Sequence, residues 1–123
     1  MDIEQENFKT PKTPKDFAIM IKQTPVVVIK MSASWCGPCK NKEFLEAYCK
    51  LKETYAKNKN VRFIELDVDD DADIIDDRKY YNIEVNAVPT FLISKNGSFI
   101  RKFEGGGYLN EIDKFIYNNI TNL

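Results

Sequence analysis

The chain has 123 residues, of which 18 are basic, 19 are acidic and 43% are hydrophobic. This length and composition predict one compact domain over residues 1–123 and exclude a disordered or collagen-like chain. The near-zero net charge argues against a general binder of nucleic acid or anionic membranes. The longest aliphatic runs have four residues, far fewer than the ~20 that a membrane span needs. The acidic start Met1–Gln5 lacks an apolar core, so we expect no secretory signal.

Two features of the composition exclude several classes of enzyme and of metal site. The sequence has no histidine and three cysteines. The first excludes serine–histidine and cysteine–histidine hydrolases and histidine-ligated zinc. The second excludes a four-cysteine zinc site and a disulfide-stapled mini-fold. An odd cysteine count without a signal indicates a reducing compartment, so we expect a cytoplasmic protein in which cysteine carries chemistry.

The first elements follow a polar N-terminal segment, residues 1–12, in which Phe8 is predicted to anchor a short strand. Thr13 has the character of a helix N-cap, because proline and an acidic first turn follow it. This helix ends near Pro25. The uniformly apolar, β-branched run Val26–Ile29 then predicts a strand buried on both faces.

A long helix is expected after the cysteine motif, reaching to about Lys57. Apolar side chains recur along it with helical spacing: Phe44, Tyr48, Leu51 and Tyr55. Val61–Val68 predicts a second buried strand. The acidic segment that follows it leads into a helix near Asp73–Tyr81.

The last third predicts a hairpin and a helix. Asn96-Gly97 between the apolar runs Phe91–Ile93 and Ser98–Phe103 is a strong hairpin signal. A final helix over Leu109–Ile120 has its apolar residues on one face. The order of elements predicts an α/β fold, with a central mixed β-sheet flanked by helices on both faces.

Cys36 and Cys39 lie where the first buried strand meets the long helix. Cysteines three residues apart face each other across one turn, so they can close a small disulfide. Backbone N–H groups at a helix start have no helical acceptor, and their partial positive charge favours the thiolate at Cys36. The spacing therefore predicts a reversible dithiol, with Cys36 as the exposed nucleophile and Cys39 as the shielded resolving thiol. A metal site or an inert structural pair remains as an alternative.

The residues around the two cysteines resemble the thioredoxin family. The motif reads Trp35-Cys36-Gly37-Pro38-Cys39-Lys40, and Val88-Pro89-Thr90 looks like that family's cis-proline turn. The resemblance runs from about Lys15 to the C-terminus and implies a thioredoxin fold. It also implies reduction of protein disulfides without an external cofactor, and recharging by a thioredoxin-reductase-like partner.

Carried over position by position, the resemblance implies a substrate groove around the cysteines. Trp35, Gly37 and Pro38 would flank it. Val88 would offer backbone groups to an extended substrate segment, with Pro89 cis and packed against the cysteines. Gly105 would let the substrate backbone approach closely.

The sequence departs from the family at Lys30, where thioredoxins usually carry a buried aspartate. A buried unpaired ammonium is costly, so we expect an ion pair with Glu65 on the neighbouring strand. Two hypotheses follow. Glu65 moves the proton that activates Cys39, or Lys30 lowers the thiol pKa through its positive charge. A third interpretation is that Lys30 extends to the surface and only packs.

Other features carry less chemistry. Cys49 is ten residues beyond Cys39, too far along a helix to reach it, and we expect a semi-buried packing residue. The acidic run after Val68 lacks the glycine and glutamate of a calcium loop. Besides a reductase acting on disulfide-containing proteins, the alternatives are a disulfide oxidase or isomerase and a non-catalytic binding module of the same fold. We expect a monomer.

Overall fold

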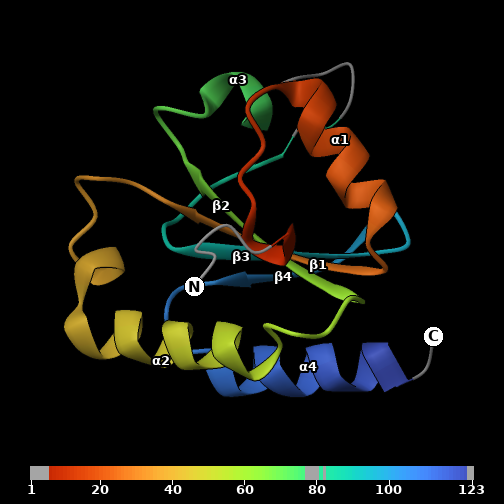
Figure 1. The fold of residues 1–123 in the computed structure, drawn as a ribbon. Coiled ribbons are helices and arrows are strands. Elements are labelled where there is room, and N and C mark those ends of the chain that lie inside the picture. The colour runs from red at the N-terminus through yellow and green to blue at the C-terminus, as the bar shows by residue number, and fades with distance from the viewer. Residues whose placement is uncertain (1–5, 77–80, 82, 122–123) are drawn as a thin grey trace.

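The computed structural model describes residues 6–76, 81 and 83–121, which build a mixed sheet with helices on both faces (Figure 1). The strands are β1 (Val26–Ser32), β2 (Val61–Asp67), β3 (Thr90–Lys95) and β4 (Ser98–Glu104), in the spatial order β2-β1-β3-β4. β1 runs parallel to β2 and antiparallel to β3, and β4 is antiparallel to β3. The predicted α/β fold is confirmed, whereas the assignment of the whole chain to one domain stays a prediction.

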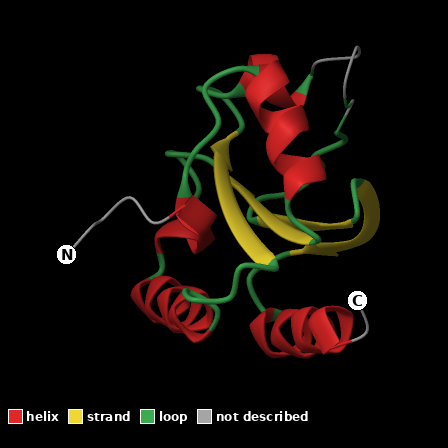
Figure 2. Ribbon diagram, turned by 45° about the vertical axis from the view of Figure 1, so that its right-hand side comes forward, coloured by secondary structure: helices red, strands yellow, loops and turns green. Residues whose placement is uncertain are grey.

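Two pairs of helices cover the sheet (Figures 1 and 2). α1 (Pro14–Gln23) and α3 (Ala72–Ile75) lie on one face, and α2 (Lys42–Thr54) and α4 (Leu109–Thr121) lie on the other. Successive side chains of β1 enter opposite layers: Val26 and Val28 pack beneath α2 and α4, while Val27 and Ile29 pack beneath α1. This is why the stretch Val26–Ile29 is apolar at every position. None of the helices in the described part of the chain is long and apolar enough to cross a membrane.

The N-terminal segment differs from the prediction. Phe8 lies in a 3₁₀ helix, η1 (Glu6–Phe8), and not in a strand. Its ring packs edge-on against Phe63, with 5.9 Å between centroids. The Asn7 side-chain amide donates to the carbonyls of Tyr55 and Ala56 at 3.2 and 2.9 Å. The segment is therefore held by a ring contact and by two carbonyls after α2. These contacts cannot be predicted from the pattern of apolar residues in the sequence.

The acidic segment forms a shorter helix than expected. α3 ends at Ile75, and its C-cap Asp76 donates its N–H to the carbonyl of Ala72. The rest of the helix predicted over Asp73–Tyr81 falls mainly on residues 77–80, outside the described residues.

The long helix after the cysteines is divided. A 3₁₀ turn, η2 (Pro38–Lys40), is separated from α2 by Asn41, whose backbone is non-helical at φ −59° and ψ 127°. The Asn41 side-chain oxygen accepts the N–H of Phe44 at 3.0 Å and caps α2. α2 then ends at Thr54 and not near Lys57. The prediction of one continuous helix from the cysteines to about Lys57 was therefore wrong. The Asn41 side chain competes with the backbone for helix N–H groups and interrupts the helix.

This cap can be tested by substitution. We expect Asn41→Ala to lower the free energy of unfolding by about 1 kcal/mol, because Phe44 loses its acceptor. Asn41→Asp keeps the acceptor and should stay close to wild type. Urea denaturation of the three proteins measures the difference, and equal midpoints for Asn41→Ala and wild type would contradict the assignment.

Candidate active site

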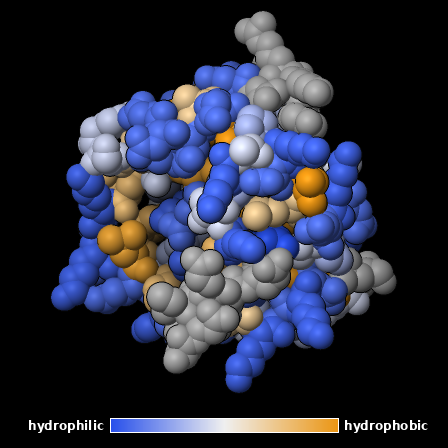
Figure 3. Space-filling view, turned by 45° about the horizontal axis from the view of Figure 1, so that its top comes forward, coloured by the Kyte–Doolittle hydropathy of each residue, from blue (hydrophilic) through white to orange (hydrophobic). Residues whose placement is uncertain are grey.

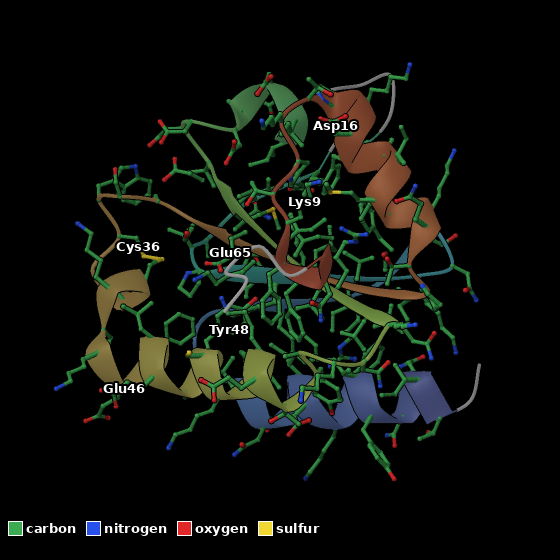
Figure 4. All side chains as sticks on the ribbon, in the orientation of Figure 1. Lys9, Asp16, Cys36, Glu46, Tyr48 and Glu65 are labelled. Carbon is green, nitrogen blue, oxygen red and sulfur yellow. A yellow bond between two sulfur atoms is a disulfide. The ribbon has the colours of Figure 1, made fainter. Side chains whose placement is uncertain are left out.

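The disulfide Cys36–Cys39 lies just beyond the carboxyl end of β1, with its Cα atoms 5.3 Å apart (Figure 4). The Cys36 N–H donates to the carbonyl of Ala33 at 3.1 Å, which fixes the turn between strand and η2. Both cysteines pack in a small apolar cluster with Ala33, Val68 and Val88. The buried strand thus delivers the two sulfurs to a defined point at the edge of the sheet.

A backbone amide is directed at one of the two sulfurs. The Cys39 N–H donates to Cys36 Sγ at 3.1 Å. Cys39 belongs to η2, and the first N–H groups of a helical turn have no acceptor within it. Once the disulfide is opened, this donor stabilises negative charge on Cys36. A backbone N–H group therefore points at the Cys36 sulfur, as predicted.

The expected difference in exposure between the cysteines is wrong. The exposed fractions are 3% for Cys36 and 6% for Cys39, so both are buried. Cys36 is covered because its Sγ lies 3.6 Å from the carbonyl oxygen of Val88, in contact with the neighbouring loop. In this oxidised state, hydrogen bonding and not exposure distinguishes the two sulfurs.

The loop opposite the disulfide contains the expected cis peptide bond, Val88–Pro89. The Gly105 N–H donates to the Pro89 carbonyl at 2.8 Å, and Gly105 has φ +112°, where a side chain would be strained. Gly106 matters as well: a Cβ there would lie 3.2 Å from Phe44 Cδ1 and 3.7 Å from Pro89 Cγ. The sequence analysis singled out only Gly105, although the run of three glycines was a signal for close packing.

Trp35 stands at the rim of a shallow hollow. Its side chain is 67% exposed, and its indole Nε1–H donates to Asp69 Oδ2 at 2.9 Å. The hollow has a volume of about 150 Å³ and is lined by Trp35, Val68, Val85, Asn86, Ala87 and Val88. Asp69 was missed because its acidic segment was considered only as the start of a helix and as a calcium loop. Gly37 and Pro38 are exposed beside the disulfide, and their contacts with substrate remain predictions.

Lys30 and Glu65 form the predicted ion pair, with 2.9 Å between Nζ and Oε1. The two residues are register partners on β1 and β2. The Lys30 side chain is 6% exposed and that of Glu65 45% exposed. Lys52 of α2, which the sequence analysis did not single out, binds the other oxygen of Glu65 at 2.9 Å. Two ammonium groups therefore share one carboxylate, and the cluster carries a net positive charge.

The ring of Tyr48 supports both ammonium groups, which lie 4.8 Å (Lys30) and 5.3 Å (Lys52) from its centroid. A cation over an aromatic face is stabilised, more so when it is desolvated. Burial disfavours ionisation of Glu65, but the hydrogen bond from Lys52 and the charge of Lys30 outweigh it. The pKa of Glu65 therefore lies below its usual value. Burial, and then the charge of Glu65, raises the pKa of Tyr48, which stays neutral.

Cys49 differs from its prediction, because it is exposed and not semi-buried. Its Sγ donates to Glu53 Oε1 at 3.3 Å, one turn further along α2. This hydrogen bond, followed by desolvation and the nearby negative charge, raises the pKa of the thiol. Among the described residues, no group of three or more histidine, cysteine or acidic side chains is arranged to hold a metal ion.

Comparison with known proteins adds to this geometry. Residues 8–118 match the thioredoxin family. The mitochondrial thioredoxin-3 of Saccharomyces cerevisiae is 39% identical over 90 residues, 73% of this chain and 63% of that protein. Mus musculus thioredoxin is 41% identical over 81 residues, 65% of this chain and 67% of that protein. The crystal structure of oxidised yeast thioredoxin-3 superposes with a TM-score of 0.71 at 32% identity, covering 90% of this chain and 94% of that one.

These matches correct one expectation. A relative at 39% identity is a mitochondrial protein, which overturns the cytoplasmic location expected from cysteine usage and the acidic N-terminus. Cysteine chemistry of this kind belongs to the family and not to one compartment. The aligned segment spans less than two thirds of that yeast relative's length.

The ion pair predicts a specific pH dependence of stability. A lowered pKa in the folded state means that Glu65 stabilises the protein above its usual pKa of about 4.5, and that this contribution disappears as the pH falls further. We expect Glu65→Gln to cost about 2 kcal/mol at neutral pH, less than the roughly 3–5 kcal/mol of a fully buried pair, because Glu65 is half exposed. This cost should shrink below about pH 4.

Glu46→Gln is the matched control. Its exposed partner Lys42 lies 3.9 Å away within α2, so we expect a change below about 0.5 kcal/mol. Denaturant unfolding at neutral and acidic pH measures both variants. A Glu65→Gln cost that is independent of pH would contradict the assigned ion pair.

Proposed function

The chain belongs to the thioredoxin family of thiol–disulfide oxidoreductases, and we propose that it reduces protein disulfides through Cys36 and Cys39. The observation that carries the proposal is the Cys39 N–H donated to Cys36 Sγ at 3.1 Å. Only a thiolate attacks a disulfide, and this donor stabilises that charge at Cys36 and not at Cys39. Thioredoxins use a redox-active disulfide without an external cofactor, and the Cys36–Cys39 pair meets that requirement.

The reaction starts from the reduced dithiol. The Cys36 thiolate attacks one sulfur of a substrate disulfide, the substrate S–S bond breaks, and the departing sulfur takes up a proton. Cys39 then loses its proton and attacks Cys36 Sγ, which releases the second substrate sulfur. Two electrons pass to the substrate, and the Cys36–Cys39 disulfide forms. A partner reductase supplies two electrons to restore the dithiol.

Substrate is proposed to bind along the hollow beside Trp35. An extended substrate segment would pair with the Val88 backbone, a strand-addition mode. Pro89 and Gly105, joined by their 2.8 Å hydrogen bond, would form the floor of this groove. Trp35, Gly37 and Pro38 would provide its other side. The rim contributed by Val85 and Asn86 would influence substrate choice.

The reductase role is favoured over the two alternatives. Gly37-Pro38 between the cysteines lacks the histidine that oxidising and isomerising members of the family often carry there. A binding module would not need an amide directed at a cysteine sulfur. Disulfide-containing proteins and a thioredoxin-reductase-like enzyme are the proposed partners, and we keep a monomer as the proposed state.

Lys30 and Glu65 are proposed to act on the thiols through charge. Glu65 is a weak proton acceptor, because two lysines at 2.9 Å lower its pKa. The relay through Glu65 is therefore the less favoured hypothesis. Lys30 lies three residues before Ala33, about 10 Å along the strand, and Ala33 packs against both cysteines. The net positive charge that Lys30, Lys52 and Glu65 carry together at this distance favours ionisation of the Cys36 thiol to the thiolate.

The cysteine roles are tested by two substitutions. We expect Cys36→Ser to abolish insulin-disulfide reduction, because no nucleophile remains. Cys39→Ser should stop at the first step and hold substrate proteins through Cys36 as mixed disulfides, which mass spectrometry identifies. Cys49→Ser is the control and should keep wild-type activity. Equal activity of wild type and Cys36→Ser would overturn the proposal, and trapping through Cys39 would reverse the roles.

The charge hypothesis predicts opposite signs for two neighbouring substitutions. Lys30→Met removes a cation and should raise the pKa of the Cys36 thiol by up to about one unit. Glu65→Gln removes the anion and should lower this pKa. Lys50→Met, an exposed site on α2, loses the same charge and should leave it unchanged. Ultraviolet thiolate absorbance across a pH titration of the reduced proteins measures all three. If Lys30→Met and Glu65→Gln shift the pKa of the Cys36 thiol in the same direction, the hypothesis is contradicted.

A further inference from the structure

An exposed aromatic ring, Tyr108, stands in the connection between β4 and α4, with 43% of the residue accessible. The strand register places this connection near the disulfide. Glu104 at the end of β4 pairs with Thr90, and Thr90 pairs with Met31 near the carboxyl end of β1. The disulfide follows that same end of β1. Tyr108 therefore lies at the end of the sheet where the proposed reaction takes place.

A short series of contacts joins Tyr108 to the reactive sulfur. Cys36 Sγ lies 3.6 Å from the carbonyl oxygen of Val88. The next residue, Pro89, accepts the Gly105 N–H at 2.8 Å. A Cβ on Gly105 would lie 3.9 Å from Tyr108 Cε2. The tyrosine ring thus borders Pro89 and Gly105, the proposed floor of the substrate groove.

The ring of Tyr108 is held in place although it is exposed. It packs against the ring of Phe103 with 5.6 Å between centroids, and Phe103 is only 5% exposed. The Tyr108 carbonyl accepts the Ile112 N–H at 2.8 Å, which ties its backbone to the first turn of α4. An aromatic side chain has only two rotatable bonds and loses little conformational entropy when it binds a partner. Tyr108 therefore presents a positioned aromatic surface.

The surface between the cis-proline and Tyr108 has little cover from side chains. A Cβ on Gly106 would lie 3.2 Å from Phe44 Cδ1 and 3.7 Å from Pro89 Cγ, and a Cβ on Gly107 would contact nothing within 4 Å. Apart from neighbours in the chain, the atoms closest to Gly105 and Gly106 are all ring carbons. Such surroundings favour an apolar group, because a charged group would lose water without gaining a partner.

We propose that Tyr108 determines specificity by contacting an aromatic side chain of the substrate, two or three residues from the cysteine that Cys36 attacks. This inference rests on the proposed function and names a substrate class for it. The contacts from Cys36 through Pro89 to Tyr108 span about two or three residues of extended chain, at roughly 3.3 Å each. The hollow beside Trp35 does not include Tyr108, so the two rings make separate contacts with a substrate.

The selection is measured in the full-length Cys39→Ser variant, in which the reaction stops after the first step. One-cysteine peptides are supplied as symmetric disulfides, with Phe or Ser two or three residues to either side of the cysteine. The Cys36 thiolate attacks, the peptide S–S bond breaks, and one peptide thiol is released for each mixed disulfide formed. Phe and Ser peptides compete, the reaction is quenched early, and mass spectrometry counts the adducts. We expect Phe on one side of the cysteine to be captured about fivefold faster than Ser.

Three substitutions in this background assign the selection to the ring. Tyr108→Ser should bring the Phe-to-Ser ratio close to one, whereas Tyr108→Phe keeps the ring and should keep the ratio. Tyr117→Ser removes another tyrosine of α4, 60% exposed and about 14 Å further along the chain direction, and should also keep it. Equal capture of Phe and Ser peptides with Tyr108 present, or a preference that survives Tyr108→Ser, would overturn the proposal.

The proposed function is tested separately by catalytic turnover. The wild-type dithiol should reduce the Ser peptide disulfide, which offers no ring to Tyr108. If it does not, while the Cys39→Ser variant still captures Phe peptides preferentially, the reductase proposal fails and the role of Tyr108 in selection stands. If turnover is normal and the preference is absent, the role of Tyr108 fails and the reductase proposal stands.

Discussion

The hydrogen bond from the Cys39 N–H to Cys36 Sγ is the interaction on which the proposed chemistry depends. It exists because β1 is buried on both faces and is followed, after the short connection 33–37, by a turn whose first amides have no helical acceptor. The strand fixes the position of the sulfur, and the turn fixes its electrostatic environment. The disulfide is thus a local product of the way the sheet meets η2, with the Val88 carbonyl and an apolar cluster closing the remaining side.

The second constraint is a lysine in the core. Lys30 occupies a strand position buried between β2, β3 and α2, where an unpaired ammonium would be very costly. Glu65 offsets the charge from the neighbouring strand, and the faces of Phe44 and Tyr48 offset it from α2. Lys52 leaves the cluster positively charged. Lys30, Lys52 and Glu65 together therefore give the core below the disulfide a net positive charge. The surface, by contrast, is dominated by scattered hydrophilic side chains on the face shown in Figure 3.

Most of the architecture was predictable because the patterns that specify it are local. The apolar β-branched run that became β1, the Asn96-Gly97 turn and the helical stripe containing Phe44 and Tyr48 each indicate one element. The Lys30–Glu65 pair was predictable because a buried lysine needs a partner. What could not be predicted depends on side chains meeting at a distance or competing with the backbone. Phe8 packs on Phe63 without forming a strand, and Asn41 interrupts a helix whose periodicity looks continuous.

The same limit applies around the disulfide. Asp69 and Lys52 looked like ordinary solvated charges in the sequence, and only the fold brings them to Trp35 and Glu65. Burial of Cys36 also depends on a loop more than 50 residues later, through the carbonyl of Val88. Exposure of Cys49 was mispredicted because its position at the margin of the apolar stripe is decided by packing and not by helical angle alone.

The interruption at Asn41 has a mechanical consequence. Because α2 begins with its own cap, its hydrogen-bond ladder starts with the Leu45 N–H on the Asn41 carbonyl. The turn that holds the two sulfurs is joined to it through one non-helical residue. Opening and closing of the disulfide can then be accommodated by the three residues of η2 and by Asn41, without breaking the hydrogen bonds that begin α2.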